Sequence, residues 1–348
     1  MTEKEPFVSS TTATASATTG PHEHSDDDAL RVCVERIAAE RFGACPSDIA
    51  ELERKRSQFS SFYAADVITV RLNSGRQFKV FLKNFGSFDH AKDTMQARRE
   101  REVVVYRDVL AGSGLGTPEY YGSVWDESQG RFWLLLEFVE GLPMSHLEFD
   151  DWVPPAGWLG RMYGYFAQHP EEWQNCDALV RHDSSFFHSI AQEALRTVSQ
   201  HSSDMGRRLE PIVRLYDRAV SVMTSQPKTL VHGTYRPPQI IIDKSRHPMR
   251  ICPVDFEKAA IGASLYDLTF IADGFDMLRL HRLFEAYRSE AERAGMSVPD
   301  NAEMTHIVDC FRLHRIMNWL AVSMARKYED DVIHKLMNMA QNVGALVL

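Results

Sequence analysis

Apolar residues recur along this chain at two different spacings, and the change between them separates its regions. Residues 28–42 place apolar side chains three and four positions apart, as on one face of a helix (Leu30, Val32, Val34, Ile37, Ala38). From about Ile49 to Lys83 the spacing falls to two, and Asn73-Ser74-Gly75 interrupts the alternation. The pattern predicts an amphipathic helix followed by a β-hairpin.

Further along, the chain alternates between helical and strand patterns. Residues 97–110, ARREREVVVYRDVL, read as a helix, and the continuous apolar run Phe132 to Val139 reads as a buried strand. Beyond them we predict mainly helices, over 158–168, 186–201, 205–225, 276–294, 304–326 and 330–347. At the other end, residues 1–27 are rich in Ser, Thr and Ala and poor in large apolar residues. We expect this tail to be disordered because it cannot offset its ordering entropy.

Composition limits the classes of function. The 348 residues are 44% hydrophobic, enough to bury a large core in one or two lobes. A net charge of -9 argues against a nucleic-acid partner and is compatible with a cationic substrate. The five cysteines form no CxxC pair, and neither a signal peptide nor an apolar run of about 18 residues is present. We therefore expect a cytoplasmic protein with reduced thiols and no membrane partner.

The candidate chemistry lies between Leu230 and Gly262. The loop LVHGTYRPPQIIID begins with His232 and Gly233 and is followed, after a short hairpin, by ICPVDFEKAAIG, which contains Asp255. These segments resemble the catalytic and metal-binding segments of aminoglycoside phosphotransferases and related small-molecule kinases, which have a protein-kinase-like fold. The family loop usually reads His-Gly-Asp, four residues and Asn, so Thr234 stands at the position of the catalytic Asp and Gln239 at that of the metal-binding Asn.

The resemblance implies an α+β fold with two lobes. We expect a small N-terminal lobe with an antiparallel sheet over 28–141 and a large helical C-terminal lobe over 142–348, after the tail at 1–27. In such a fold Lys83, at the end of QFKVFLK, resembles the strand lysine that reaches the nucleotide phosphates, and Glu102 the helix glutamate that orients it. Glu100 is the alternative partner.

Other nucleotide contacts follow from the same resemblance. Backbone groups near Glu137 to Val139 would bind the adenine of ATP, or the base of another nucleoside triphosphate. The segment that should form the phosphate loop has no glycine, so Ser60 and Ser61 would offer backbone N–H groups or hydroxyls instead. Asp255 would hold Mg²⁺, with the longer Gln239 as a weaker ligand. Asp267 resembles a buried structural carboxylate that ties the loop to the next helix.

The changed position in the loop decides the activity. A Thr234 hydroxyl has no useful proton affinity near neutral pH, and a general base contributes about 10²–10⁴-fold. His232 usually braces the loop in this fold and is a poor substitute. Arg236 has two open interpretations, as a group that stabilises phosphate charge or as an ordinary surface residue.

Three functions remain. The first is a phosphotransferase acting on a hydroxyl of a sugar-like, aminoglycoside-like or cationic small molecule, slowed by the loss of the base. The second is a pseudokinase that binds nucleotide or a protein partner, and the third is a kinase-fold enzyme with altered chemistry such as nucleotidyl transfer. Asp150 and Asp151 either attract a cationic acceptor or lie in an exposed loop, and the sequence does not identify the acceptor.

Overall fold

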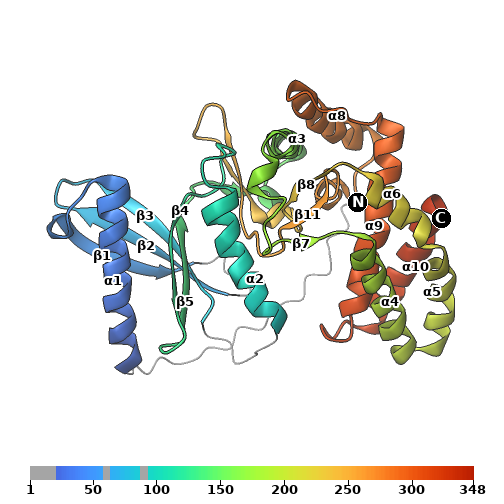
Figure 1. The fold of residues 1–348 in the computed structure, drawn as a ribbon, viewed down its shortest axis with the longest axis horizontal. Helices are drawn as coiled ribbons and strands as arrows, with labels where there is room; N and C mark the ends of the chain where they lie inside the picture. The colour runs from blue at the N-terminus through green and yellow to red at the C-terminus, as the bar shows by residue number, and fades with distance from the viewer. Residues whose placement is uncertain (1–20, 58–62, 87–92) are drawn as a thin grey trace. The chain divides into compact units, whose positions relative to one another are not determined.

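The computed structural model describes residues 21–57, 63–86 and 93–348. The chain divides between Glu140 and Gly141 into a sheet unit and a helical unit (Figure 1). That division falls one residue before the boundary expected from the sequence. The two units together confirm the predicted α+β fold class.

Antiparallel strands form the sheet of the first unit. The strands are β1 (Ile49–Arg56), β2 (Ala64–Leu72), β3 (Gln77–Asn84), β4 (Tyr120–Asp126) and β5 (Arg131–Glu137), in the spatial order β1-β2-β3-β5-β4 (Figure 1). The hairpin of β2 and β3 is confirmed, with Val70 opposite Phe78 and Ala65 opposite Lys83. β5 pairs with β3 and β4, and its consecutive residues Trp133 to Leu136 are all buried, so both of its faces are covered; this explains its continuous apolar run.

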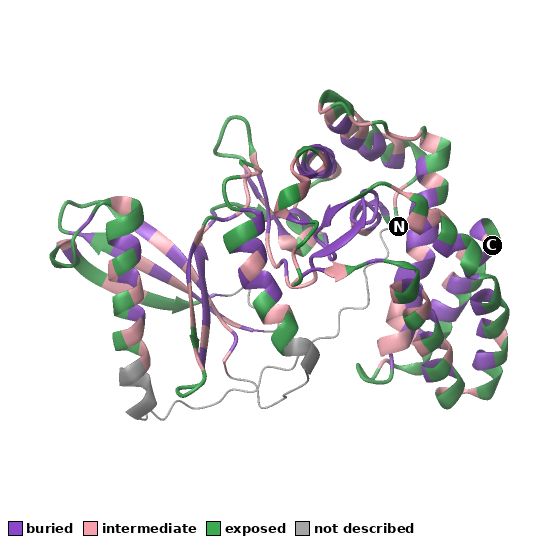
Figure 2. Ribbon diagram, in the orientation of Figure 1, coloured by how far each residue is buried: buried purple, intermediate pink, exposed green. Residues whose placement is uncertain are grey.

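One face of this sheet is buried against the helix α1 (Pro21–Phe42). Alternation turns Phe78, Val80 and Leu82 into that core and leaves Lys83 on the opposite face. From α1 the core receives Leu30, Val34, Ile37 and Ala38, as predicted. Figure 2 shows the buried parts of α1 in purple. The expected fifth member, Val32, is instead 67% exposed, because it points away from the sheet.

The first helix begins earlier than the sequence predicts. The expected disordered tail extends to Asp27, but α1 starts at Pro21, while residues 1–20 lie outside the described chain. Pro is favourable in the first turn of a helix, and acidic side chains near the N-terminus interact favourably with the helix dipole. Asp26 also pairs with Arg131 at 2.8 Å and Asp27 with Arg54 at 3.5 Å, and these contacts with the sheet favour the early start.

The helix predicted over 97–110 is present in two parts. An α-helix, α2 (Asp93–Val104), continues into one turn of π-helix, η2 (Val105–Val109). Val105, Tyr106 and Val109 are buried, so the change in winding lies in a packed segment. The part that carries Glu102 is α-helical, as expected.

The second unit is mainly helical. Its longer helices are α3 (Val153–Gln168), α4 (Ser184–His201), α5 (Ser203–Leu215), α6 (Asp217–Ser225), α8 (Met277–Arg293), α9 (Asn301–Val322) and α10 (Asp330–Val347). Shorter elements are α7 (Thr269–Ala272) and the 3-10 turns η3 (Met144–His146), η4 (Phe149–Trp152), η5 (Pro170–Glu172) and η6 (Pro237–Gln239). One small sheet has the order β10-β9-β6 (Arg250–Pro253, Ile240–Asp243, Leu142–Pro143), and another β7-β11-β8 (Val180–Arg181, Ala260–Ala263, Lys228–Val231).

Most predicted helices of this unit are present, but the residues expected to form one helix over 205–225 form two, α5 and α6. The helix is divided at Tyr216, whose N–H bonds to the Val213 carbonyl three residues back rather than four. The Tyr216 side chain is fully buried and its hydroxyl lies 3.2 Å from His314 Nδ1 of α9. Tertiary packing therefore sets the break, which helical spacing alone does not reveal.

The close approach of two backbone segments requires glycine at the start of the helical unit. Gly141 has φ +134°, and a Cβ there would lie 2.5 Å from the Ile242 carbonyl of β9. Only glycine has access to this conformation at such a short distance.

Within the described residues, no helix is long and apolar enough to cross a membrane. All five cysteine thiols are free.

Candidate active site

Lys83 is held by a carboxylate within the sheet unit. Its Nζ lies 2.7 and 2.9 Å from the two carboxylate oxygens of Glu102 on α2. The Lys83 side chain is 12% exposed and that of Glu102 is 1% exposed. The ammonium also lies over the rings of Tyr63 and Phe85, at 5.2 and 5.5 Å. These contacts fix an oriented positive charge on the face of β3 opposite α1, where it can bind an anion such as a phosphate.

Glu100, the alternative partner expected from the sequence, does not pair with Lys83. Glu100 is exposed and accepts a hydrogen bond from Gln96 Nε2 at 2.9 Å. Two residues along a helix differ in direction by about 200°, since each residue turns the chain by about 100°. Glu102 therefore faces Lys83, while Glu100 lies on the exposed side.

The expected base-binding backbone lies at the end of β5. The Glu137 N–H donates to the Glu119 carbonyl at 2.9 Å, so it is already engaged. Val139 is buried, and among the described residues its N–H has no hydrogen-bond partner. Of the two expected groups, Val139 is thus the one able to donate to a base. Ser60 and Ser61 lie outside the described residues.

In the helical unit, Asp267 organises the loop that follows β8. Its Oδ2 accepts the His232 N–H at 2.5 Å and its Oδ1 accepts the Gly233 N–H at 2.9 Å. Gly233 has φ +83°, and a Cβ there would lie 2.0 Å from the Lys258 carbonyl, so the turn requires glycine. Asp267 is therefore the tie between loop and following helix that the sequence predicts.

The ring of His232 braces the loop from inside. Its Nε2 donates to the Val254 carbonyl at 2.9 Å, and its Nδ1 accepts the Thr234 N–H at 3.3 Å. The ring also lies against Phe256, with centroids 4.3 Å apart. Burial lowers the pKa of His232 to about 4, against the raising effect of the Val254 carbonyl. The ring is consequently neutral at pH 7, with both nitrogens engaged.

Burial acts in the opposite direction on Asp267. It raises the pKa of the carboxyl to about 7, and the two backbone N–H donors oppose that rise because they stabilise the ionised form. Both oxygens are engaged with the backbone. Asp267 is therefore a structural group with no oxygen directed at a substrate.

Gln239 and Asp255 lie side by side and form the candidate metal site. Gln239 Nε2 donates to Asp255 Oδ2 at 2.6 Å, and the Val254 N–H donates to the Gln239 carbonyl at 2.9 Å. Asp255 has φ +73°, a left-handed conformation that is uncommon for a residue with a side chain and is often found at functional sites. Gln239 Oε1 is buried and has no hydrogen-bond partner among the described residues. A carboxylate and an amide oxygen are the hard ligands that suit Mg²⁺.

Thr234 stands at the centre of the loop but is a poor proton acceptor. It is 8% exposed, and its Oγ1 has no hydrogen-bond partner in the described part of the chain. The Arg236 N–H donates to the Thr234 carbonyl at 2.6 Å, and the Arg236 side chain is exposed. The loop therefore carries a buried hydroxyl at Thr234 and an exposed guanidinium at Arg236.

Sequence patterns missed the support that α3 gives to this loop. Tyr235 is fully buried, donates from its hydroxyl to the Pro155 carbonyl at 3.0 Å, and stacks on Trp158 at 5.6 Å. The sequence shows an aromatic residue, Tyr235, directly after Thr234, but its hydrogen-bond partner Pro155 lies 80 residues earlier in the chain. Only the fold identifies such a contact.

Asp150 and Asp151 do not form an uncompensated acidic site. Asp150 pairs with Arg282 at 2.9 Å, and Asp151 pairs with Lys244 at 2.6 Å. Because each carboxylate has a basic partner, the pair offers little net attraction to a cationic acceptor. The exposed-loop interpretation is the better one for Asp150.

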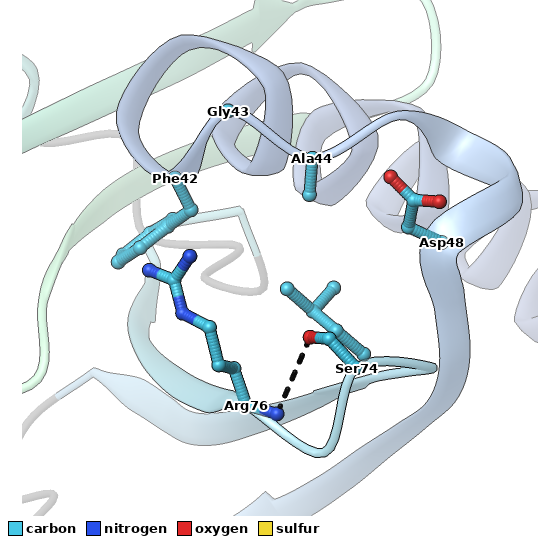
Figure 3. Close-up of a pocket in the computed structure, with 7 residues that line it drawn as sticks. Phe42, Gly43, Ala44, Asp48, Ser74 and Arg76 are labelled. Atoms are coloured by element: carbon cyan, nitrogen blue, oxygen red, sulfur yellow. Dashed lines mark hydrogen bonds between the residues drawn. The ribbon is translucent and has the colours of Figure 1, made fainter.

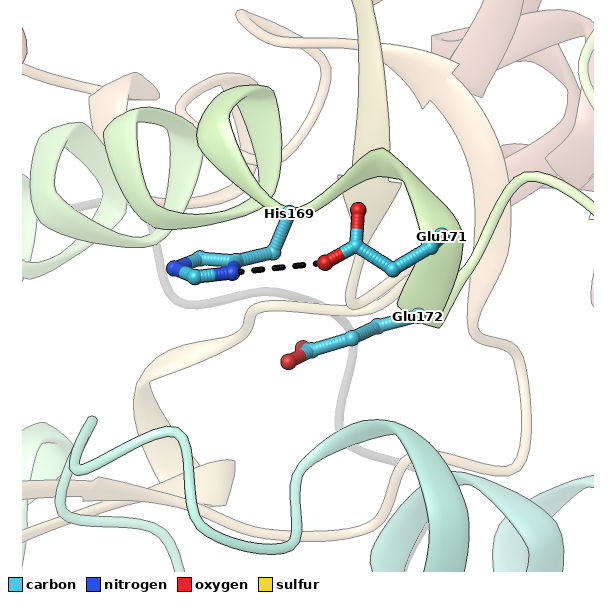
Figure 4. Close-up of side chains that lie close together, drawn as sticks. All are labelled: His169, Glu171 and Glu172. Carbon is cyan, nitrogen blue, oxygen red and sulfur yellow. Dashed lines mark ion pairs between the residues drawn. The ribbon is translucent and has the colours of Figure 1, made fainter.

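Two other features lie away from these residues. A cavity of about 270 Å³ in the sheet unit is lined by Phe42, Gly43, Ala44, Asp48, Leu72, Ser74 and Arg76 (Figure 3). In the helical unit, His169 Nδ1 lies 3.5 Å from Glu171, and Glu172 lies next to them (Figure 4). Glu172 accepts a hydrogen bond from the Tyr165 hydroxyl at 2.8 Å. The ligand atoms of His169, Glu171 and Glu172 all lie within 4.8 Å of one another. None of the candidate catalytic or binding motifs described above contains the residues of this cavity or of the His169 cluster.

Solved structures of several phosphotransferases and kinases are similar in fold to this chain. The wild-type aminoglycoside 2'-phosphotransferase-IIIa, solved as a GDP complex, is similar in structure with a TM-score of 0.58 and 15% identity, covering 91% of this chain and 99% of that one. Choline kinase from Cryptosporidium parvum has a TM-score of 0.56 and 14% identity, covering 92% and 94%. A macrolide 2'-phosphotransferase from Brachybacterium faecium has a TM-score of 0.56 and 15% identity, covering 90% and 98%.

At these identities the structural matches establish the fold. A search of curated proteins gives no sequence match. The model of the phosphotransferase enzyme family, however, matches residues 58–299, which include Lys83, Glu102, the loop at His232 and Asp255. The chain therefore belongs to the phosphotransferase enzyme family.

Proposed function

We propose that this protein binds a nucleoside triphosphate with Mg²⁺ and transfers the terminal phosphoryl group to a small molecule. Its family membership supports phosphotransfer to a small molecule as the general activity. The observation that carries the proposal is the pairing of Gln239 with Asp255, because the buried Gln239 Oε1 beside this carboxylate has no hydrogen-bond partner among the described residues.

The assigned roles follow from each side chain's surroundings. Lys83, oriented by Glu102, would bind a phosphate, and the Val139 N–H would bind the base. Asp255 and Gln239 would hold Mg²⁺, which neutralises charge on the phosphates when it is bound. A GDP complex is known for one structural relative, so GTP is tested beside ATP.

The binding test is thermal unfolding with and without Mg²⁺, ATP and GTP. Binding to the folded state raises the unfolding free energy by about 2.7 kcal/mol when the ligand is at 100 times its Kd. Asp255→Asn tolerates the left-handed backbone but removes the charge, so the Mg²⁺-dependent part of the stabilisation should disappear. Exposed Asp177→Asn is the control and should respond as the wild type does. Absence of stabilisation in the wild type would refute nucleotide binding.

A pseudokinase is the second candidate, and the buried hydroxyl of Thr234 favours it. A protein of that kind would bind the nucleotide and leave it intact. The measurement that separates the two is nucleotide turnover: stabilisation by nucleotide without production of ADP or GDP, with any acceptor, would favour the pseudokinase. Release of pyrophosphate without added phosphate, together with a nucleoside monophosphate attached to the acceptor, would indicate nucleotidyl transfer.

A further inference from the structure

The ionisable groups of the loop show which kind of acceptor it can serve. His232 is neutral and both its nitrogens are engaged, and Asp267 uses both oxygens for backbone N–H groups. Asp255 accepts from Gln239 and is the candidate metal ligand. Thr234 stands where the family has its base and has almost no proton affinity near pH 7. A hydroxyl acceptor would therefore have to lose its proton without help from these four side chains.

The loop offers hydrogen-bond donors and positive charge in place of a base. The Thr234 hydroxyl is more than nine-tenths buried and has no partner in the described chain, so it can donate to an oxygen that approaches it. The Arg236 guanidinium has neither an ion pair nor a hydrogen bond with any described residue. Its charge is close enough to lower the pKa of His232, after the larger effect of burial. A hydroxyl donor and a guanidinium in the same loop suit an anion.

We propose that the acceptor is an oxyanion, a carboxylate or a phosphate group already ionised at neutral pH, with Thr234 and Arg236 binding it. This inference rests on the proposed phosphotransferase function. An acceptor oxygen forms a bond to the terminal phosphorus of the nucleotide. The bond from that phosphorus to its bridging oxygen breaks, and the electron pair leaves with the nucleoside diphosphate. No proton is transferred, so the products are an acyl phosphate or a diphosphate and no general base is required.

The test compares acids with alcohols of matched skeleton in the full-length protein. Turnover of MgATP and MgGTP is measured with propionate against propanol, succinate against butanediol, and inorganic phosphate. Hydroxylamine converts an acyl phosphate to a hydroxamate, while phosphorus NMR detects a diphosphate, so the two sources of the oxyanion are distinguished. We expect at least one oxyanion to exceed its matched alcohol or water by about 10²-fold, the contribution of the missing base.

Variants show whether the two residues bind the anion. Arg236→Gln should raise the KM for the active oxyanion about tenfold with a smaller change in kcat, whereas exposed Arg326→Gln should leave both unchanged. Thr234→Asp should lower turnover with the oxyanion, because it places a negative charge in the site, and raise turnover with alcohols. Glu257→Gln tests the remaining carboxylate of the segment and should leave transfer to the oxyanion intact.

The outcomes separate this inference from the proposed function. Alcohols that match or exceed the acids would overturn the oxyanion acceptor and leave the phosphotransferase standing, as would loss of transfer in Glu257→Gln. An Arg236→Gln variant with unchanged KM would also overturn it. Binding of nucleotide without turnover in either series would remove both.

Discussion

Two polar clusters, one in each unit, depart from the family pattern to different extents. In the sheet unit, Lys83 and Glu102 keep both the residue types and the contact, at 2.7 Å. In the helical unit, the loop keeps its bracing residues, His232, Gly233 and Asp267, but carries Thr234 at the reactive position. The difference separates two requirements: binding a phosphate depends on a fixed charge, whereas proton removal depends on one basic atom. Replacing the residue that carries the basic atom therefore leaves the bracing contacts of the loop intact.

Restoring a carboxylate in the loop gives the largest expected effect. Thr234→Asp should raise nucleotide hydrolysis, or transfer to an alcohol, by up to about 10²–10⁴-fold, because it supplies a base where the hydroxyl stands. Thr234→Asn has a similar shape without a base and should give no rise. Steady-state turnover of both variants checks this, and equal rates for them would show that the loop does not use a base at this position.

Breaking the charge pair of the sheet unit should mainly change stability. Glu102→Ala leaves the Lys83 ammonium without its carboxylate in a largely buried site, which costs about 3–5 kcal/mol of unfolding free energy. Urea denaturation measures the change, and Glu100→Ala on the exposed side of the same helix should cost less than about 0.5 kcal/mol. Adding Lys83→Met to Glu102→Ala should recover part of the loss. A loss no larger in Glu102→Ala than in Glu100→Ala would contradict a structural role for the pair.

Two glycines with similar dihedral angles test how tightly the loop is packed. Gly233→Ala should cost about 3 kcal/mol or more, since its Cβ would meet the Lys258 carbonyl at 2.0 Å in addition to the strain at φ +83°. Gly274 has φ +79° but nothing within 4 Å of its Cβ, so Gly274→Ala should cost only about 1 kcal/mol. Thermal or urea unfolding compares them. Similar losses would mean that the loop can move away from Lys258.

The pH dependence of stability should show a smaller effect from a histidine outside the loop. Burial, then the charges of His182 and Arg315, lower the pKa of His314 to about 3 from its usual 6.5. Between these values the unfolded state binds more protons, so the unfolding free energy falls as the pH falls below 6.5, by about 2 kcal/mol at pH 5. His314→Gln should flatten this slope, whereas His306→Gln at an exposed position of α9 should not. Equal slopes in both variants would contradict this assignment.

Much of the candidate site could be predicted because its signals are local. Alternation over Phe78 to Lys83 puts the lysine opposite the core face, and helical spacing separates Glu102 from Glu100. The loop motif identifies His232, Thr234, Gln239 and Asp255 because the number of residues between them along the chain is the same as in the family pattern. The sequence could not reveal the early start of α1, the break at Tyr216, or the exposure of Val32, since each depends on the packing of distant segments.

The sequence by itself determined the fold class, the family and the identity of the residue at the base position. Only the tertiary structure decided what surrounds that residue: both nitrogens of His232 are engaged and Asp267 is tied to the backbone. Thr234 Oγ1 and Gln239 Oε1 are buried and have no hydrogen-bond partner within the described ranges. The reason is physical. A side chain's identity is encoded at one position, but its burial and hydrogen bonds are set by segments that meet only when the chain folds.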